Sequence, residues 1–322
     1  MSDRTAIQYV DATWNPIRGC SPVSPGCANC YAARQARRFA GDGLPDGAPG
    51  PYHGLVEGAR WMGAIRIVED ALTQPLRWRK PRRVFVCSMS DLFHERVTDE
   101  QIAAVFGVMA RARQHTFLLL TKRAERMRKW SEWLESEVAW PLANVWLGVT
   151  AETAEHLERR SELLQMVPAA VRWLSLEPLL EEVSVRGVLL GNGRRGLHVT
   201  STEGLVQVAA CECGHGHGFT RCPNTGGVTA RCGTRGCACP GFRRELGHGI
   251  HWVVGGGETG PGARPCRVEW IRRVVDECHA TGTPVFVKQA GARAMVAPAL
   301  RHRKGANPSE WPKDLRVREI PA

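Results

Sequence analysis

The sequence lacks any long apolar segment. No run of hydrophobic residues approaches the roughly 18 that a membrane-spanning helix requires. The first residues, MSDRTAIQYVDATWNP, also lack the basic and then apolar pattern of an export signal. We therefore expect no membrane contact and a cytoplasmic location. The 322 residues suffice for one large domain or two small ones, and a hydrophobic content of 43% is ordinary for a globular protein.

Acidic residues are too few to balance the basic ones. Asp and Glu number 32 against 43 Lys and Arg, which gives a formal net charge of +11. A basic surplus favours a polyanionic partner such as nucleic acid, although it also serves solubility alone. The chain also has 12 cysteines, and in a reducing compartment clustered cysteines indicate metal or redox chemistry more often than disulfides.

Short apolar runs alternate with helical patterns along most of the chain. This alternation predicts an α/β fold with a parallel sheet, as a complete or partial TIM-like (β/α) barrel, although a doubly wound open sheet alternates similarly. One expected helix has Thr98 as N-cap and Gln101 completing a capping box. The repeating segments are 82–94, 116–127, 144–165, 171–183, 250–265 and 283–292, and ATWNPIRGC precedes them as a first strand.

Three parts of the chain break this rhythm. Residues 191–249 are rich in Gly, Cys and His, so we expect an insertion between the barrel segments 1–190 and 250–295. Residues 41–63 are rich in Gly and Pro and indicate a loop. Residues 296–322 are basic and contain prolines, which indicates a peripheral tail.

One short loop contains Cys20, Cys27 and Cys30. Three thiolates from one loop suit a [4Fe–4S] cluster, because they hold three irons and leave the fourth open to a small ligand. A zinc site would need a fourth protein ligand from elsewhere, since structural zinc sites are closed. The sequence therefore favours an iron–sulfur cluster with one open position.

Seven ordered segments carry a resemblance to a known family. The chain resembles the phage-borne three-cysteine-motif family of radical-SAM-like proteins from about residue 10 to 292. The resemblance implies a TIM-barrel-like core, a [4Fe–4S] cluster and S-adenosylmethionine, and some members are linked to hypermodification of phage DNA bases. Six residues separate Cys20 from Cys27, where radical-SAM enzymes commonly have three. The segments are TWNPIRGCSPVSPGCANCYA, SMSDLFH, LTKRAERM, VWLGVTAE, LSLEPLL, WVVGGGETG and FVKQAG.

Candidate site residues lie at the carboxyl ends of the expected strands, where barrels place their functional groups. The resemblance suggests that GGGE, formed by Gly255, Gly256, Gly257 and Glu258, meets the methionyl amino group, although a glycine run also suits a plain turn. Carboxylates at Glu152 and Glu177 suit ribose hydroxyls or a substrate amine. Taken singly, each charged candidate suits a salt bridge at the barrel mouth equally well. The remaining candidates are Lys122, Arg123 and Lys288 for a carboxylate or phosphate, Asp91 and His94 for proton transfer, and Tyr31 or Cys87 for quenching a product radical.

A second cysteine cluster lies in the 191–249 insertion. A loop-rich segment of this size needs metal to fold, and its ligands suit one or two zinc ions or an auxiliary iron–sulfur cluster. Arginines surround these thiols, and the segment RWRKPRR contains Trp78, so both regions are candidates for nucleic-acid contact or solvated charge. The candidate ligands are Cys211, Cys213, Cys222, Cys232, Cys237, Cys239, His215 and His217.

Together these features predict a radical S-adenosylmethionine enzyme that modifies or isomerises a nucleobase. The resemblance implies a 5′-deoxyadenosyl radical, with phage DNA carrying a modified thymine as substrate and the host cytoplasm as location. Such chemistry needs an electron donor such as a flavodoxin or ferredoxin. Two alternatives stay open: a zinc-containing nucleic-acid-binding protein without redox activity, and radical modification of a protein or metabolite.

Overall fold

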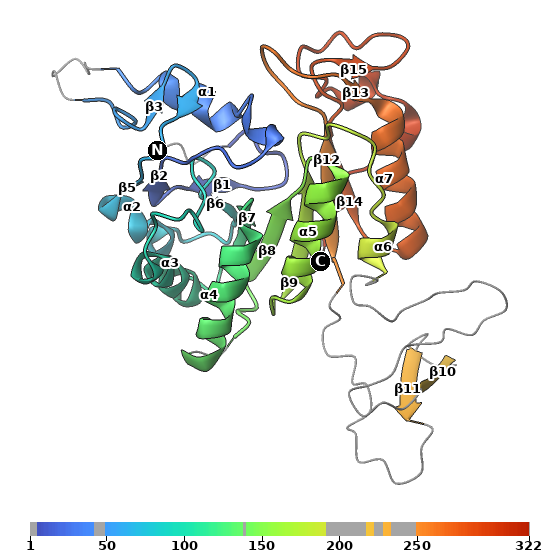
Figure 1. Ribbon diagram of the computed structural model, residues 1–322, viewed down its shortest axis with the longest axis horizontal. Coiled ribbons are helices and arrows are strands. Elements are labelled where there is room, and N and C mark those ends of the chain that lie inside the picture. Colours follow the sequence, from blue (N-terminus) through green and yellow to red (C-terminus); the bar gives the residue numbers. More distant parts are fainter. Residues whose placement is uncertain are drawn as a thin grey trace.

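The protein is built on a curled sheet of seven parallel strands, which forms a half-barrel (Figure 1). The computed structural model describes residues 5–41, 49–137, 140–190, 217–221, 228–232 and 249–321. Neighbouring strands follow one another in chain order, whereas a doubly wound sheet reverses its order at a switch point. The prediction of a partial (β/α) barrel is confirmed. The strands are β1 (Ala12–Trp14), β6 (Arg83–Val86), β7 (Thr116–Thr121), β8 (Val145–Thr150), β9 (Val171–Leu176), β12 (Trp252–Gly256) and β14 (Val285–Gln289).

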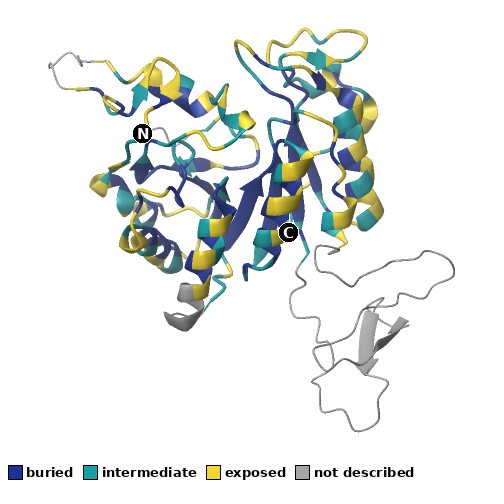
Figure 2. Cartoon of the chain, in the orientation of Figure 1, coloured by how far each residue is buried: buried dark blue, intermediate teal, exposed yellow. Residues whose placement is uncertain are grey.

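The main helices cover the outer face of this sheet. Alternate strand residues such as Val145, Leu147 and Val149 pack outward in one cluster with helix side chains. Figure 2 shows the helices buried on the side toward the strands and exposed on the other. The expected capping box forms, since Thr98 and Gln101 exchange hydrogen bonds. These helices are α3 (Asp99–Arg111), α4 (Ala124–Glu137), α5 (Ala154–Gln165) and α7 (Val268–Thr281).

Aromatic rings fill the inner face of the half-barrel. Strand residues one position out of phase with the outward set, such as Trp146, Trp173 and Trp252, form a second core that Tyr9 completes. The indole of Trp173 lies against Gly148, where a Cβ would come within 2.5 Å of the ring. Because these side chains are buried and packed together, a ligand site has more room at the strand ends than within this layer.

The C-terminal segment, residues 296–322, packs against the half-barrel. Residues 296–322 were expected to be a peripheral tail, but Trp311 and Leu315 are buried in the main core. The backbone then runs along the free edge of β14, where Val287 N–H donates to the carbonyl of Val317 at 2.9 Å. The C-terminal segment therefore covers an open edge of the half-barrel.

Two small units lie beyond the carboxyl ends of the strands (Figure 1). One contains α1 (Tyr31–Arg37) and a hairpin of β3 (Val56–Glu57) and β4 (Arg60–Trp61), and only the hairpin falls within residues 41–63, which the sequence indicates as a loop. The other pairs β13 (Cys266–Arg267) with β15 (Ala294–Met295). The shorter elements are β2 (Ile17–Arg18), β5 (Arg66–Ile67), β10 (His217–Arg221), β11 (Val228–Cys232), α2 (Glu69–Leu72), α6 (Arg186–Leu189) and the 3-10 helices Pro25–Cys27, Gln74–Arg77, Pro308–Glu310 and Lys313–Leu315.

Residues 77–83 lie before β6, at the amino edge of the sheet and away from these units. Trp78 is buried there under the guanidinium of Arg82, 4.8 Å from its ring centroid. Nucleic-acid contact and solvated charge were the two alternatives for this segment, and the buried Trp78 ring is not free to stack on a base. Among the described helices, none has both the length and the apolar character that a membrane crossing needs.

Candidate functional site

The loop that carries the three cysteines crosses the carboxyl ends of the strands. Gly19 bridges to Ser90 after β6, and the Tyr31 hydroxyl donates to the carbonyl of Ser88 at 2.8 Å. Farther along the sheet, Glu152 after β8 and Glu258 after β12 accept hydrogen bonds from the same loop. The loop is therefore tied to both halves of the sheet, and its cysteines lie at the barrel mouth.

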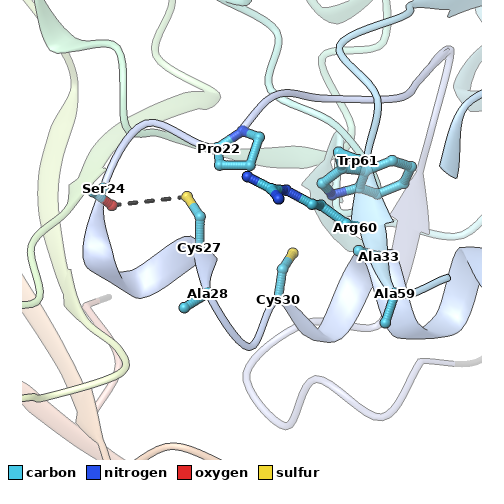
Figure 3. A pocket seen from close by; sticks show the side chains of 9 residues that line it. All are labelled: Pro22, Ser24, Cys27, Ala28, Cys30, Ala33, Ala59, Arg60 and Trp61. Atoms are coloured by element: carbon cyan, nitrogen blue, oxygen red, sulfur yellow. Dashed lines mark hydrogen bonds between the residues drawn. The ribbon is translucent and has the colours of Figure 1, made fainter. Parts of the chain in front are cut away.

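Two of the cysteines line a pocket of roughly 400 Å³ (Figure 3). Cys27 and Cys30 lie on one side, and Arg60 and Trp61 of the β3–β4 hairpin face them. Cys20, Cys27 and Cys30 are free thiols of intermediate exposure. In the described residues, no three His, Cys, Asp or Glu side chains converge where a single metal ion would sit. Cys20 is not among the residues that line this pocket, so the pocket opens beside Cys27 and Cys30.

Cys20 has the most polar surroundings of the three. Burial raises the pKa of the Cys20 thiol to about 12, and the nearby Asp91 carboxylate acts in the same direction. Arg123 opposes them, because its guanidinium lies 3.8 Å from the sulfur.

Glu152 holds the cysteine loop in place. Its fully buried carboxylate accepts hydrogen bonds from the Ser24 hydroxyl and, at 3.1 Å, from the Gly26 amide. Lys122 and Arg160 approach the other oxygen at 3.4 and 2.9 Å. Burial would raise the pKa of Glu152, but these cations and donors outweigh it and lower the pKa to about 2. The carboxylate predicted to bind a cofactor is thus occupied by protein groups.

Glu258 holds the other side of the cysteine loop in place. It accepts from the Asn29 amide at 3.0 Å and forms a bidentate pair with Arg264, whose guanidinium also donates to the carbonyl of Pro25. Burial opposes ionisation, yet Arg264 and Asn29 lower the pKa of Glu258.

The glycines before Glu258 have different surroundings. Gly256 and Gly257 pack closely on β14 and the residue after it, since a Cβ would lie 2.7 Å from the carbonyl oxygen of Gln289 and 2.3 Å from that of Ala290. A Cβ on Gly255 would meet nothing within 4 Å. Close packing of two strands therefore accounts for the last two glycines of this run.

Asp91 and His94 form a buried polar network under the loop. Asp91 accepts from the Thr121 hydroxyl, the Lys122 amide and Arg123. His94 accepts the Arg96 amide at Nδ1, so its Nε2 carries the proton and donates to the Ser21 hydroxyl at 2.9 Å. Burial lowers the pKa of His94, which favours this neutral form. Asp91 therefore fixes the residues at the end of β7, and His94 fixes Ser21 of the cysteine loop.

Glu177, Lys288 and Gln289 form a separate cluster at the ends of β9 and β14. The Glu177 carboxylate accepts from Lys288 Nζ at 3.0 Å and from the Gln289 amide at 2.8 Å. Lys288 is 25% exposed, and Lys122 beside Glu152 is 18% exposed. Of the charged groups predicted at the mouth, these two amines and Glu177 keep the most room for a ligand.

The two predicted radical-quenching residues differ in access. Tyr31 is 48% exposed, and its hydroxyl is bound to the Ser88 carbonyl. Cys87 is buried, and it has a φ of +57° where β6 ends. Burial raises the pKa of Cys87 to about 12.

Most of the second cysteine cluster lies outside the described residues. This holds for Cys211, Cys213, His215, Cys222, Cys237 and Cys239. His217 and Cys232 lie in the two-stranded sheet of β10 and β11, where the register places them opposite each other.

Several residues in this site were missed in the sequence. Asn29, Arg264 and Ser24 hold the loop, and Arg60 and Trp61 line the pocket. Their partners are far away in the chain: Asn29 and Glu258 are separated by 229 residues.

Residues 4–312 match the family described as "Protein of unknown function (DUF5131)". No curated protein and no solved structure matches the chain.

Proposed function

Because the chain belongs to the DUF5131 family of proteins of unknown function, we propose its function from the site itself: a radical S-adenosylmethionine enzyme that modifies a nucleobase in DNA. The observation that supports this proposal best is the placement of Cys20, Cys27 and Cys30. They are free thiols on one loop at the mouth of a half-barrel, with a pocket beside two of them. These residues would hold the [4Fe–4S] cluster.

The chemistry that a cluster and S-adenosylmethionine supply when bound is hydrogen-atom abstraction from an unactivated carbon. The protein has to orient the reactants and exclude water. Glu152 and Glu258 fix the loop, and the aromatic layer under the mouth closes the barrel interior. Lys122, Glu177 and Lys288 are the groups suited to bind the carboxylate and hydroxyls of the cofactor or substrate.

Charge beside the mouth supports a nucleic-acid substrate. Arg37 is the last residue of α1 and Arg38 is its C-cap, and both are exposed. No ion pair joins either of them to an acidic side chain of the described residues. Tyr31 and Phe39 are 48% and 55% exposed on the same segment. Exposed cations with aromatic rings are the combination that binds a phosphate backbone and stacks on unpaired bases.

Anaerobic purification tests the cofactor proposal. We expect brown protein with about four irons and four sulfides per cluster and 5′-deoxyadenosine formation when dithionite is added. Triple Cys→Ala replacement at positions 20, 27 and 30 should abolish all three signals. Iron-free protein that holds only zinc would instead support the nucleic-acid-binding alternative.

Digestion of DNA tests the substrate proposal. Nucleosides from cells or phage with and without the gene are compared by mass spectrometry. We expect at least one modified nucleoside to change in mass or retention time. Identical profiles would rule out DNA as the substrate while leaving the cofactor proposal intact.

A further inference from the structure

Arg123 is the only charged side chain within the described residues that donates a hydrogen bond to one of the three cysteine sulfurs. It follows β7, and its backbone amide is fixed by the Thr121 hydroxyl at 2.9 Å. From there the side chain reaches under the cysteine loop, where the residue is 9% exposed. Its NH1 group lies 3.8 Å from the Sγ atom of Cys20.

Every arm of this guanidinium is held in position. NH1 also donates to Asp91 at 3.1 Å, and Nε donates to Glu95 at 2.9 Å. NH2 donates to the Ser21 hydroxyl at 2.7 Å and to the Ser21 carbonyl at 3.3 Å. A planar fork with this many fixed acceptors keeps its N–H group directed at the sulfur.

The other two sulfurs lack such a donor. Among the described residues, the Cys27 sulfur has one hydrogen-bond partner, the Ser24 hydroxyl at 3.8 Å, and the Cys30 sulfur has none. Arg60 faces both of them across the pocket without a hydrogen bond to either sulfur. The three cysteines therefore differ in hydrogen bonding, since only the Cys20 sulfur accepts a bond from a charged group. The network around Arg123 explains this asymmetry, because Asp91 and Glu95 hold the guanidinium on the Cys20 side of the loop.

We propose that Arg123 is a positioning residue that acts through Cys20 and raises the reduction potential of the group that the three cysteines hold. This inference rests on the proposed function. Hydrogen bonds to ligand sulfurs and nearby positive charge stabilise the reduced state, which carries one more negative charge. Removing the donor makes reduction less favourable.

The test compares Arg123→Lys with wild type by spectroelectrochemical titration after anaerobic reconstitution. Lysine keeps the positive charge but lacks the planar guanidinium with its spaced N–H donors. It therefore cannot donate hydrogen bonds to Asp91, Glu95 and Cys20 at the same time. We expect reduction to become on the order of tenfold less favourable, which for one electron corresponds to about 59 mV. We also expect the electron paramagnetic resonance spectrum of the reduced cluster to change.

Arg126→Lys is the matched control. Arg126 lies three residues away and donates to the carbonyls of His94 and Val97 and to Asp99, without contacting Cys20. A lower potential in Arg123→Lys with an unchanged one in Arg126→Lys supports the proposal. Equal reduction potentials in wild type, Arg123→Lys and Arg126→Lys overturn the proposal. This holds even if Arg123→Lys lowers the melting temperature, because a purely structural role of Arg123 would change the melting temperature alone. Wild-type protein that assembles no cluster refutes the proposed function itself.

Arg123→Met removes the charge as well and should lower the potential further. It leaves Asp91 buried without its cation, so the variant is at risk of unfolding. Iron content and thermal melting identify that outcome, and Arg123→Lys then decides the question alone.

Discussion

At the scale of single residues, the carboxylates at the barrel mouth serve the cysteine loop. Glu152 follows β8 and Glu258 follows β12, and both accept hydrogen bonds from the loop. Glu152 and Gly26 are 126 residues apart, so no local pattern connects them. This leaves Glu177 and the two lysines as the groups with room for ligands.

Replacing Glu152 with Gln tests this supporting role. Its pKa of about 2 lies below the usual value of 4.5, so its ionisation contributes stability above pH 4.5 that is lost as the pH falls toward 2. We expect Glu152→Gln to lose on the order of 3 kcal/mol at pH 7, measured by urea unfolding. Glu125→Gln, which breaks an exposed pair with Arg159, should cost less than about 1 kcal/mol. Equal losses in the two variants would contradict the assignment.

At the scale of elements, the strands of the half-barrel could be predicted from the sequence. The two small units beyond their carboxyl ends could not. Each strand is a short apolar run with a polar end, and this pattern depends on neighbouring residues alone. The β3–β4 hairpin has only two residue pairs and lies in a segment rich in Gly and Pro, which suggests a loop. The burial of Trp311 depends on contacts with the main core, which a basic segment with prolines does not reveal. The alternation along β8 also places Gly148 inward, under the ring of Trp173.

Two glycines provide a matched test of this packing. Gly148→Ala would place a Cβ 2.5 Å from the Trp173 ring, and we expect a loss of about 1–3 kcal/mol from overpacking. Gly107 lies exposed in α3, where a Cβ would meet nothing within 4 Å, so Gly107→Ala should stabilise the protein by about 0.5–1 kcal/mol. Urea unfolding measures both. A neutral Gly148→Ala would mean that the aromatic layer is loosely packed.

At the scale of the whole molecule, basic residues lie at both edges of the sheet, and only one edge carries the cysteines. Reversing charge at Arg37 and Arg38, beside the mouth, should weaken binding of single-stranded DNA and lower the slope of log affinity against log salt by about two. Arg111, the last residue of α3, and Arg113, two residues later, are both exposed and form the matched double reversal at the amino edge. Fluorescence anisotropy across a salt series measures both pairs. Equal effects would indicate non-specific attraction by net charge.

Three histidines give the molecule a common response to acid. His94, His115 and His251 each accept a backbone amide at Nδ1, from Arg96, Arg82 and Arg172, and burial lowers the pKa of all three. The unfolded chain binds protons at its ordinary pKa near 6.5, whereas the folded protein resists them. Stability therefore decreases as the pH falls below 6.5, before the carboxylates protonate below 4.5.

Thermal melting from pH 7.5 to 5.5 measures this response. We expect the melting temperature of wild type to fall over this interval, and that of His251→Asn to fall less, because an amide oxygen accepts the Arg172 N–H group without titrating. A wild-type melting temperature that does not change between pH 7.5 and 5.5 would show that protonating these rings costs the fold nothing. The decline below pH 4.5 would then come from Glu152 and the other carboxylates whose pKa is lowered.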